Sequence, residues 1–326
     1  MHSPSAGAVT LARIEAAATR IAPYVLRTPL LPSRALSELL GVRVSLKYEF
    51  LQETASFKPR GAFNKLLSLT PAQRERGLVA VSGGNHGKAV AFAASRLGLR
   101  ARIVMFQSTA PSAVAAARAY GAEVELLPTP AEGFARAEAL EREGLTYVHP
   151  FDDPEVVAGQ GTLGLELIAD APDVTDIIAS IGGGGMIGGV ALAARALRPE
   201  VRVWGVETEG ADAMSQALAA GKVVPLPAIT SLAATLGAPA VCALTMELVQ
   251  RHVEEVLVVP DHGAVADLLW ILDHCHLLVE PAAACTLSAA RRLAGRLDPA
   301  AHLVIILCGA SISLAELAGF RERVGL

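Results

Sequence analysis

The sequence has few of the features that mark a secreted or membrane-spanning protein. Its four cysteines, Cys242, Cys275, Cys285 and Cys308, form no CxxC pair, and a chain of 326 residues does not need disulfides to hold a core. No uninterrupted apolar run approaches the roughly 18 residues that span a bilayer. Residues 1–20 lack a basic segment followed by an apolar core, as a secretory signal would have. We therefore expect a reduced, soluble, cytoplasmic protein.

Aromatic residues and positive charge are also scarce. Aromatics make up 4% of the chain, and the net charge is −4 without any basic run. Nucleic-acid binding needs clustered positive charge and often stacking rings. Hydrophobic residues, by contrast, reach 52%, with a mean hydropathy of +0.43. Their spread through the chain favours a sheet covered on both faces, with neither nucleic acid nor membrane as a partner.

Strand-like and helix-like segments alternate with short breaks, which predicts parallel α/β sheets. A first series has strands at 78–82, 101–106 and 123–127, each followed by a helix. A second series has strands at 176–181, 201–207, 255–260 and 302–309. Two series predict two domains with a cleft between them. The proline- and glycine-rich stretch 221–240 is interpreted as a loop.

Lys58 lies in the segment LQETASFKPRGAFNKLL, residues 51–67. Pro59 follows it, and proline is favoured in the first turn of a helix. The lysine therefore stands at a helix start, where its amine can face a cleft. A lysine in a dry site has a lowered pKa and becomes a nucleophile toward an aldehyde. Without further context, Lys58 could equally be an ordinary surface cation.

A second segment, VSGGNHGKAVAFAA at 81–94, ends a strand with two glycines before Asn85 and His86 open a helix. The free N–H groups of a helix start favour an anion. The Asn85 amide can also donate to a phenolate or carboxylate oxygen. In the alternative interpretation, Asn85 only caps the helix and His86 is solvated.

Four consecutive glycines, Gly182 to Gly185, stand between a strand and a helix. Backbone N–H groups of such a loop can wrap a phosphate. A dinucleotide loop is the rival, because glycines alone are weak evidence and Glu207 stands near the place of that motif's acidic residue. No GKS or GKT follows, which argues against a nucleotide triphosphatase. In a fourth segment, LCGASISL at 307–314, Cys308 could be an ordinary buried thiol.

Together, in this order and spacing, the four segments resemble the fold-type II pyridoxal-phosphate family, which includes serine and threonine dehydratases, serine racemase and threonine synthase. The stretch SFKPRGAFN is the most specific part of the match. The resemblance favours a cofactor phosphate over a dinucleotide at the glycines. It implies a fold like that of tryptophan synthase β, with two open parallel-sheet α/β domains and the cofactor in the cleft. Residues 1–50 and 151–326 would form the large cofactor-binding domain, and 51–150 the small domain.

The resemblance also assigns roles to single residues. Lys58 matches the lysine that binds pyridoxal 5′-phosphate as a Schiff base and, once freed, acts as the general base. Asn85 matches the donor to the ring oxygen. Apart from the resemblance, Glu280, which precedes Pro281, is expected to approach the cofactor ring, and its role stays open. The other matches are Phe57 against the pyridine ring, Gly182, Gly183, Gly184, Gly185 and Met186 around the phosphate, Cys308 facing the pyridine nitrogen, and Ser82, Gly83, Asn85 and His86 closing over the substrate carboxylate.

Cys308 bears on the reaction. An aspartate facing the ring nitrogen would hold it protonated, whereas a neutral thiol does not. In the family, serine dehydratases often have cysteine there, and the stretches 206–213 and 279–285 also look closest to catabolic serine dehydratases. The resemblance thus implies an L-serine/L-threonine ammonia-lyase, which gives pyruvate or 2-oxobutanoate plus ammonia by β-elimination.

Two residues of the chain differ from the pattern of the family. Ala55 stands where many relatives have glycine, and Ala213 stands where racemase-like members have the aspartate of a divalent-metal site. The dehydratase pattern instead implies a monovalent cation, for which carbonyl and carboxylate oxygens suit K⁺. Its ligands would be Glu207 and the backbone carbonyls of Gly182, Ala211, Leu236 and Ala238.

Several activities share this cofactor apparatus. A serine racemase, a threonine synthase-like lyase or a dehydratase of a bulkier β-hydroxy amino acid therefore stays open as an alternative. A pyridoxal-phosphate-binding protein without turnover is the alternative from a different class. The expected partner is a small amino-acid substrate, and because family members are commonly dimers or tetramers, we expect a homodimer.

Overall fold

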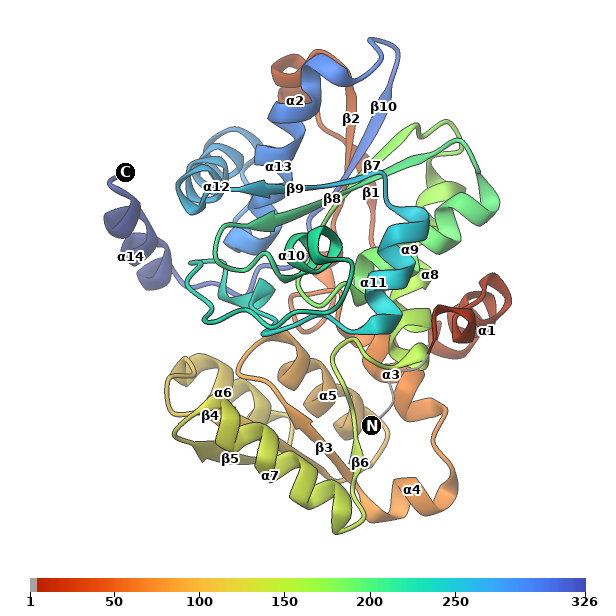
Figure 1. Ribbon diagram of the computed structural model, residues 1–326, viewed down its shortest axis with the longest axis vertical. Coiled ribbons are helices and arrows are strands. Elements are labelled where there is room, and N and C mark those ends of the chain that lie inside the picture. Colours follow the sequence, from red (N-terminus) through yellow and green to blue (C-terminus); the bar gives the residue numbers. More distant parts are fainter. Residues whose placement is uncertain (1–4) are drawn as a thin grey trace.

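The computed structural model describes residues 5–326 and contains two sheets, which lie one above the other in Figure 1. All described strand pairs are parallel except the one at an edge of the larger sheet. The predicted class, α/β with two parallel sheets, is confirmed. The exact domain boundaries stay a prediction.

The smaller sheet has the order β5 (Glu123–Leu127), β4 (Ala101–Phe106), β3 (Leu78–Val81) and β6 (Thr146–Tyr147). Strand β3 is buried along its whole length. Leu78 and Ala80 pack with helices α3 (Pro59–Leu67), α5 (Asn85–Arg96) and α6 (Pro111–Ala119). Val79 and Val81 face the opposite layer, which contains α7 (Pro130–Arg142). A strand covered on both faces needs apolar residues at every position, as this one has.

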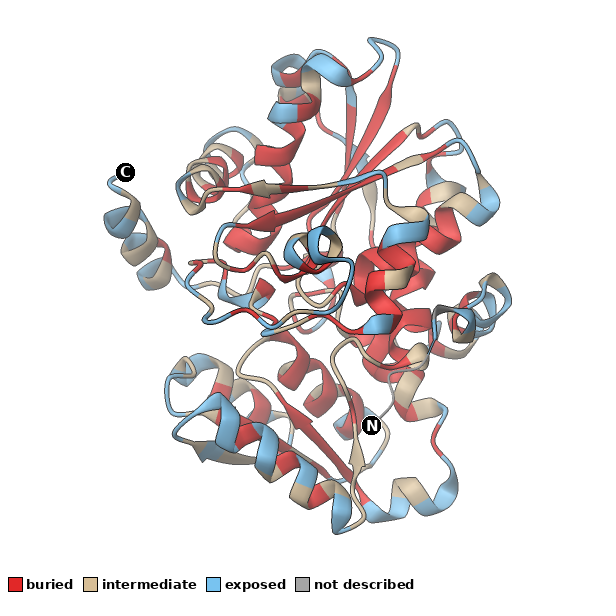
Figure 2. Cartoon of the chain, in the orientation of Figure 1, coloured by how far each residue is buried: buried red, intermediate tan, exposed pale blue. Residues whose placement is uncertain are grey.

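The larger sheet has the order β1 (Leu30–Pro32), β2 (Arg43–Lys47), β10 (His302–Ile306), β7 (Asp176–Ser180), β8 (Arg202–Thr208) and β9 (Glu255–Val259). Strands β7 and β10 are buried throughout, as are most residues of α8 (Pro154–Asp170), α9 (Gly185–Leu197) and α13 (Pro281–Leu293). Figure 2 shows this burial as a continuous core around the central strands. The central strands therefore have rigid ends from which loops can project.

The remaining helices lie mostly at the periphery. They are α1 (Leu11–Ile21), α2 (Arg34–Leu40), α4 (Pro71–Arg76), α10 (Ala213–Ala220), α11 (Ala243–His252), α12 (Asp261–Cys275) and α14 (Leu314–Val324). The stretch 221–240 contains a single short 3₁₀ turn, Ala234–Leu236, so the predicted loop is confirmed.

The sequence did not predict β1 and β2. Strand β2 contains Ser45 and Lys47, both buried, and these polar residues interrupt the apolar signal. The Lys47 ammonium is accommodated by Glu166, whose carboxylate lies 2.6 Å from Nζ. A buried charge with a partner can thus occupy a strand position that a sequence pattern reserves for apolar residues.

Helices α3 and α8 approach each other closely beside the junction of the two sheets. A Cβ on Gly159 would lie 2.5 Å from the Arg60 carbonyl oxygen, so only glycine permits this contact. The buried Arg60 guanidinium is paired with Glu49 at 2.8 Å and with Glu166 at 2.7 Å. These contacts fix the start of α3, which directly follows Lys58.

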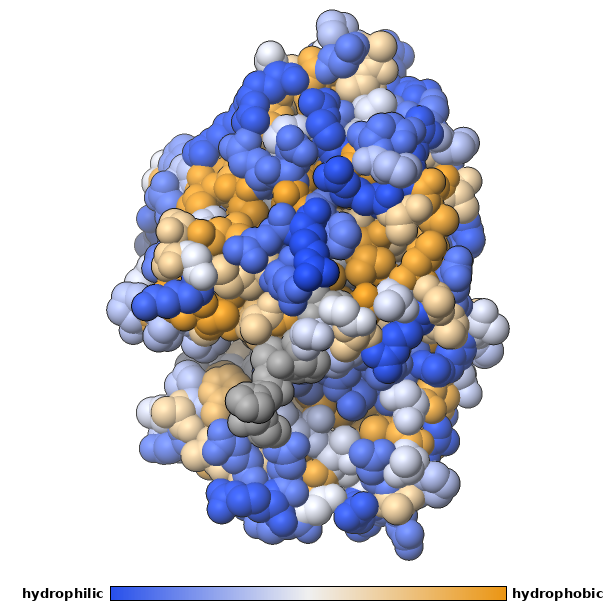
Figure 3. Space-filling view, turned by 45° about the vertical axis from the view of Figure 1, so that its right-hand side comes forward, coloured by the Kyte–Doolittle hydropathy of each residue, from blue (hydrophilic) through white to orange (hydrophobic). Residues whose placement is uncertain are grey.

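No helix in residues 5–326 is long and apolar enough to cross a membrane. On the face shown in Figure 3, hydrophobic residues lie in separate patches among hydrophilic ones. The absence of a spanning helix from this part of the chain agrees with the short apolar runs of the sequence.

Candidate active site

The predicted segments meet at the carboxyl ends of parallel strands, where α/β sheets usually bind ligands. Strands β7 and β10 are neighbours, with Ile177 opposite Val304. The glycine loop after β7 and Cys308 after β10 are therefore adjacent, and Ser180 Oγ lies 3.4 Å from Cys308 Sγ. The turn after β3 reaches the same place from the smaller sheet, through the contact of Asn85 described below.

The loop before Lys58 is held against the residues after β10 by backbone pairing. The Phe57 N–H donates to the Cys308 carbonyl at 3.0 Å, and the Ala310 N–H donates to the Ala55 carbonyl at 2.9 Å. Ser56 and Gly309 form an isolated antiparallel bridge between these two bonds. Two segments far apart in the sequence thus bring Lys58 beside Cys308.

Ala55 has a φ of +56°. This is the left-handed region, which glycine enters freely and a residue with a Cβ enters at a cost of about 1–2 kcal/mol. The glycine expected there from the resemblance therefore has a physical reason. This chain keeps the same turn with an alanine in it.

The Lys58 amine is half-buried and lies 5.1 Å from the centroid of the Phe57 ring. Its Nζ donates to the Pro150 carbonyl at 3.3 Å. Burial lowers the pKa of Lys58 to about 8, although the nearby carboxylate of Glu280 opposes the shift. Near neutral pH a useful fraction of this amine is therefore uncharged and nucleophilic, as the sequence predicts.

The turn from β3 into α5 leaves backbone donors available. The Gly84 N–H donates to Ser82 Oγ at 3.1 Å, and α5 then begins at Asn85 without a side-chain cap. A Cβ on Gly83 would lie 2.5 Å from Thr109 Oγ1, so a side chain there would disturb the turn. The uncapped N–H groups at this helix start suit a carboxylate.

Asn85 is buried, and both ends of its amide have partners. Its Nδ2 donates to the two oxygens of Glu280 at 3.0 and 3.3 Å, and its Oδ1 accepts from Ser311 Oγ. Glu280 is the N-cap of α13, so this contact joins the smaller sheet's α5 to the larger sheet. The side chain does not cap its own helix, so the alternative in which Asn85 is only a helix cap is wrong.

His86 is also buried, so its interpretation as a solvated histidine is wrong. Its Nε2 lies 2.8 Å from the Val148 carbonyl oxygen. Burial, reinforced by the charge of Lys58, lowers the pKa of His86 to about 3. The imidazole is therefore neutral near pH 7, and a carbonyl partner requires that Nε2 bear the proton.

The four glycines form a close-fitting loop. A Cβ on Gly183 would lie 2.0 Å from Phe151 Cδ1, and Gly184 has a φ of +87°. A Cβ on Gly182 would lie 3.1 Å from the Leu236 carbonyl oxygen. Helix α9 starts at Gly185, and Met186 after it is buried. The loop exposes backbone N–H groups at a helix start, the geometry that suits a phosphate.

Cys308 is buried with its sulfur near Ser180 Oγ and the Ala282 carbonyl. Burial, with the charge of Glu280, raises the pKa of this thiol to about 12. The side chain is therefore a neutral thiol at any physiological pH. The sequence-based expectation of an uncharged group at this position agrees with its environment.

The residues present fit pyridoxal phosphate. Lys58 offers an amine for the aldehyde, and the glycine loop offers backbone N–H groups at the start of α9, packed so closely against Phe151 and Leu236 that side chains are excluded. The buried hydroxyl of Ser56, two residues before Lys58, has no partner among the described residues. An unpaired buried hydroxyl is costly unless a ligand or water satisfies it. Which atoms contact the cofactor stays a prediction for each matched residue.

Glu207, the predicted carboxylate ligand of a cation, has hydrogen-bond partners at the start of α10. Its carboxylate accepts from the Met214 N–H at 2.8 Å and from the Ser215 N–H and hydroxyl at 2.8 and 2.7 Å. It thus binds the start of α10, and burial raises its pKa to about 7. The Leu236 carbonyl accepts from the Ala238 N–H at 2.7 Å. The cation site stays a prediction.

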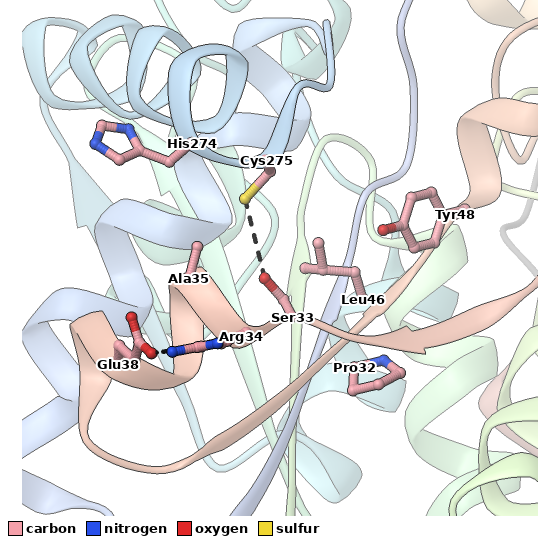
Figure 4. Close-up of a pocket in the computed structure, with 9 residues that line it drawn as sticks. All are labelled: Pro32, Ser33, Arg34, Ala35, Glu38, Leu46, Tyr48, His274 and Cys275. Atoms are coloured by element: carbon pink, nitrogen blue, oxygen red, sulfur yellow. Dashed lines mark hydrogen bonds and ion pairs between the residues drawn. The ribbon is translucent and has the colours of Figure 1, made fainter.

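Figure 4 shows a separate surface pocket of about 400 Å³ between β1, α2 and the end of α12. Ser33 Oγ lies 3.9 Å from Cys275 Sγ across it, and Arg34 is paired with Glu38 at its rim. None of the predicted site residues lines this pocket. It is distinct from the place where Lys58, Asn85 and Cys308 meet.

Two α/β units with a half-buried amine and a glycine loop between them suit an enzyme with a phosphorylated aldehyde as cofactor. The chain belongs to the pyridoxal-phosphate-dependent enzyme family, whose model matches residues 21–309. This family depends on pyridoxal phosphate, and the naming of several relatives as ammonia-lyases places the chain among its lyases.

Three similar proteins carry the names of three different activities. The chain is 39% identical to an L-threonine ammonia-lyase of Geobacter sulfurreducens, over 95% of this chain and 77% of that one. It is 36% identical to a phenylserine dehydratase of Ralstonia pickettii, over 97% and 96%. The solved structure of maize serine racemase has a TM-score of 0.90 at 33% identity and covers 97% of this chain and 98% of its own.

Proposed function

We propose that the chain is a pyridoxal-phosphate-dependent ammonia-lyase that acts on L-threonine and L-serine. The products would be 2-oxobutanoate or pyruvate, with ammonia. The observation that supports this most directly is the Lys58 amine, whose pKa is lowered to about 8 beside a neutral Cys308 thiol. The likeness to threonine ammonia-lyases supports the substrate class.

When bound, pyridoxal phosphate supplies an aldehyde for the amine and an electron-withdrawing ring that acidifies the substrate Cα–H. Lys58 would hold the cofactor and, once displaced by the substrate amine, accept the Cα proton at Nζ. Its lowered pKa suits this role because a general base works best when its pKa is near the operating pH.

The start of α5 would bind and orient the substrate carboxylate. Ser82 and the N–H groups around Asn85 and His86 supply donors, and neutral His86 adds no competing charge. A carboxylate held there fixes the direction in which the Cα–H bond points. Orientation of this kind brings the proton within reach of a base.

The neutral Cys308 thiol bears on the choice of reaction. A group that cannot ionise does not hold the ring nitrogen protonated, so the ring withdraws less electron density than it would beside an aspartate. Prompt loss of the β-hydroxyl, which would leave as water with a proton from the Lys58 ammonium, would then compete with return of that proton to Cα. Elimination of the β-hydroxyl is therefore expected to be faster than racemisation at Cα.

The test is product analysis with the purified, pyridoxal-phosphate-loaded protein. L-Threonine, L-serine and 3-phenylserine are supplied separately, and keto acid, ammonia and the D-amino acid are measured. Keto acid and ammonia in equal amounts, with little D-isomer, are expected from L-threonine and L-serine. Faster formation of D-serine than of pyruvate would instead make the chain a racemase. Keto acid from phenylserine alone would support the bulkier-substrate alternative.

Two further expectations belong to this proposal. A K⁺ ion would be bound by Glu207 with the carbonyls of Gly182, Ala211, Leu236 and Ala238, and replacing K⁺ by Na⁺ would then lower turnover. The protein would be a cytoplasmic homodimer, which light scattering on the purified protein and fractionation of the producing cells can test.

A further inference from the structure

Lys88 stands one turn after Asn85 on α5, and the proposed reaction gives it no role. The side chain is half-buried, and its Nζ donates to Ser311 Oγ at 2.5 Å. Its partner is thus a hydroxyl rather than a carboxylate. The half-buried ammonium and the buried Asn85 amide thus share one hydroxyl, that of Ser311.

The ammonium determines the direction of the Ser311 hydroxyl. An ammonium can only donate hydrogen bonds, whereas a hydroxyl has a single hydrogen. Because Lys88 donates to the Ser311 oxygen, the Ser311 hydrogen is left for its other neighbour, Asn85 Oδ1. The oxygen end of the Asn85 amide is therefore bound on the Ser311 side.

Glu280 favours the same orientation of the Asn85 amide, through a contact with its nitrogen end. Its buried carboxylate accepts from Asn85 Nδ2, from Thr235 Oγ1 at 3.1 Å and from the Ser311 N–H at 3.1 Å. Burial raises the pKa of Glu280, whereas hydrogen bonds from Asn85, Thr235 and the Ser311 N–H oppose that shift. With donors on both of its oxygens the carboxylate acts as the acceptor, so the nitrogen end of the amide faces it. The two ends of an asparagine amide are otherwise alike in shape, and only such partners fix which is which.

We propose that Lys88 and Ser311 are positioning residues that, together with Glu280, present the Asn85 nitrogen rather than its oxygen to the ring oxygen of the cofactor. The proposal rests on the proposed function, in which Asn85 faces that ring oxygen. The two contacts of Nδ2 go to the two oxygens of one carboxylate, and if they share a single hydrogen the second hydrogen remains for the cofactor. A reversed amide would set two oxygen atoms against each other and lose this bond.

The first experiment measures the dissociation constant of pyridoxal phosphate by absorbance titration of the cofactor-free protein. Ser311→Ala and Lys88→Met should each weaken binding by about tenfold, the value of one hydrogen bond. Ser311→Thr and Lys88→Arg keep the hydroxyl and the donor, so both should bind nearly as the wild type does. The exposed Lys222, changed to Met, is the control for loss of a lysine and should have no effect.

A double variant separates positioning from general damage. In an Asn85→Ala background, Ser311→Ala should cause no further loss of affinity, because the side chain it orients is gone. Full additivity of the two losses, or wild-type affinity in Ser311→Ala alone, would overturn the proposal. If Ser311→Ala does not fold, the comparison of Lys88→Met with Lys88→Arg tests the same chain of bonds.

A second readout needs neither cofactor nor activity. Hydrogen exchange of the Asn85 side-chain amide, followed by NMR in the cofactor-free protein, should be slow in the wild type and at least tenfold faster in Ser311→Ala. Unchanged exchange would overturn the proposal even if the enzyme turns over threonine. A wild-type protein that shows the protected amide but releases no ammonia would instead overturn the proposed function and leave the positioning chain intact.

Discussion

The Phe57 N–H donates a hydrogen bond to the Cys308 carbonyl across 3.0 Å. This bond joins the loop that presents Lys58 to the end of the central strand β10. Strand β10 is buried throughout, so the loop is attached to the interior of the larger sheet. The lysine amine consequently has a fixed place next to the neutral thiol, although the two residues lie 250 positions apart in the sequence.

The first prediction concerns the turn that precedes this bond. Ala55→Gly removes the left-handed strain of about 1–2 kcal/mol but increases the entropy of the unfolded chain, for a net gain of about 0.5–1 kcal/mol in the free energy of unfolding. Urea denaturation of the cofactor-free protein measures it. The exposed helical Ala115, changed to Gly, should instead lose about 1 kcal/mol. Equal losses at both positions would show that Ala55 is unstrained.

The glycine loop gives a second prediction. Gly183→Ala would place a Cβ 2.0 Å from Phe151 Cδ1, so the ring or the loop must move. We expect a loss of about 1–3 kcal/mol in the free energy of unfolding, together with weaker pyridoxal-phosphate binding. Gly295→Ala is the matched control, because a Cβ there meets nothing within 4 Å. Adding Phe151→Ala to Gly183→Ala should restore part of the loss of affinity, and a failure to do so would contradict the contact.

The Lys58 amine gives a third prediction. With its pKa lowered from 10.5 to about 8, the second-order rate of pyridoxal-phosphate capture by the cofactor-free protein should rise with pH and level off above about pH 8. Stopped-flow absorbance measures this rate. A rate that still climbs steeply between pH 9 and 10.5 would indicate an ordinary exposed lysine.

The same shift affects stability in a defined direction. Between about pH 8 and 10.5 the unfolded chain holds a proton on Lys58 that the folded chain has lost, so stability should increase with pH in this window. The penalty for burying the amine is fully present below pH 8. Lys58→Met has no such group, and its unfolding free energy should lack this increase.

His86 gives a fourth prediction, at acid pH. Its pKa is about 3 when folded and 6.5 as a model value, so the unfolded state takes up the proton first as the pH falls below 6.5. The wild type should lose about 2–3 kcal/mol from this residue between pH 6.5 and 4. His86→Gln keeps a donor for Val148 and should show a smaller loss. The exposed His262, changed to Gln, controls for removal of an imidazole.

Much of the fold could be predicted because the buried strands are short apolar runs bounded by glycine or proline. The interior strands of both sheets agree with the predicted ones within about three residues at each end. Strand β2 was missed because Lys47 is buried with a carboxylate partner from α8, which no local pattern reveals. Helix propensity and periodicity describe neighbours along the chain, whereas this pair forms only in the folded molecule.

Some residues of the candidate site could likewise be predicted from the sequence, and others could not. Lys58, Asn85 and the four glycines stand in locally recognisable segments. Phe151, which fits against Gly183, stands in no such segment, and Ser311 stands in the fourth segment but its bond to Asn85 has no local signal. Their roles depend on which loops the sheet order brings together. Glu280 before Pro281 stood out in the sequence, but its contact with Asn85 required the structure.

The central claim is that Lys58 is the residue that holds the cofactor. The most direct measurement is borohydride reduction of the pyridoxal-phosphate-loaded protein, followed by digestion and mass spectrometry. We predict a single stoichiometric phosphopyridoxyl label on the peptide that contains Lys58. Lys58→Ala should have neither label nor turnover, whereas Lys222→Ala should have both. A label on another lysine, or full activity in Lys58→Ala, would contradict the account.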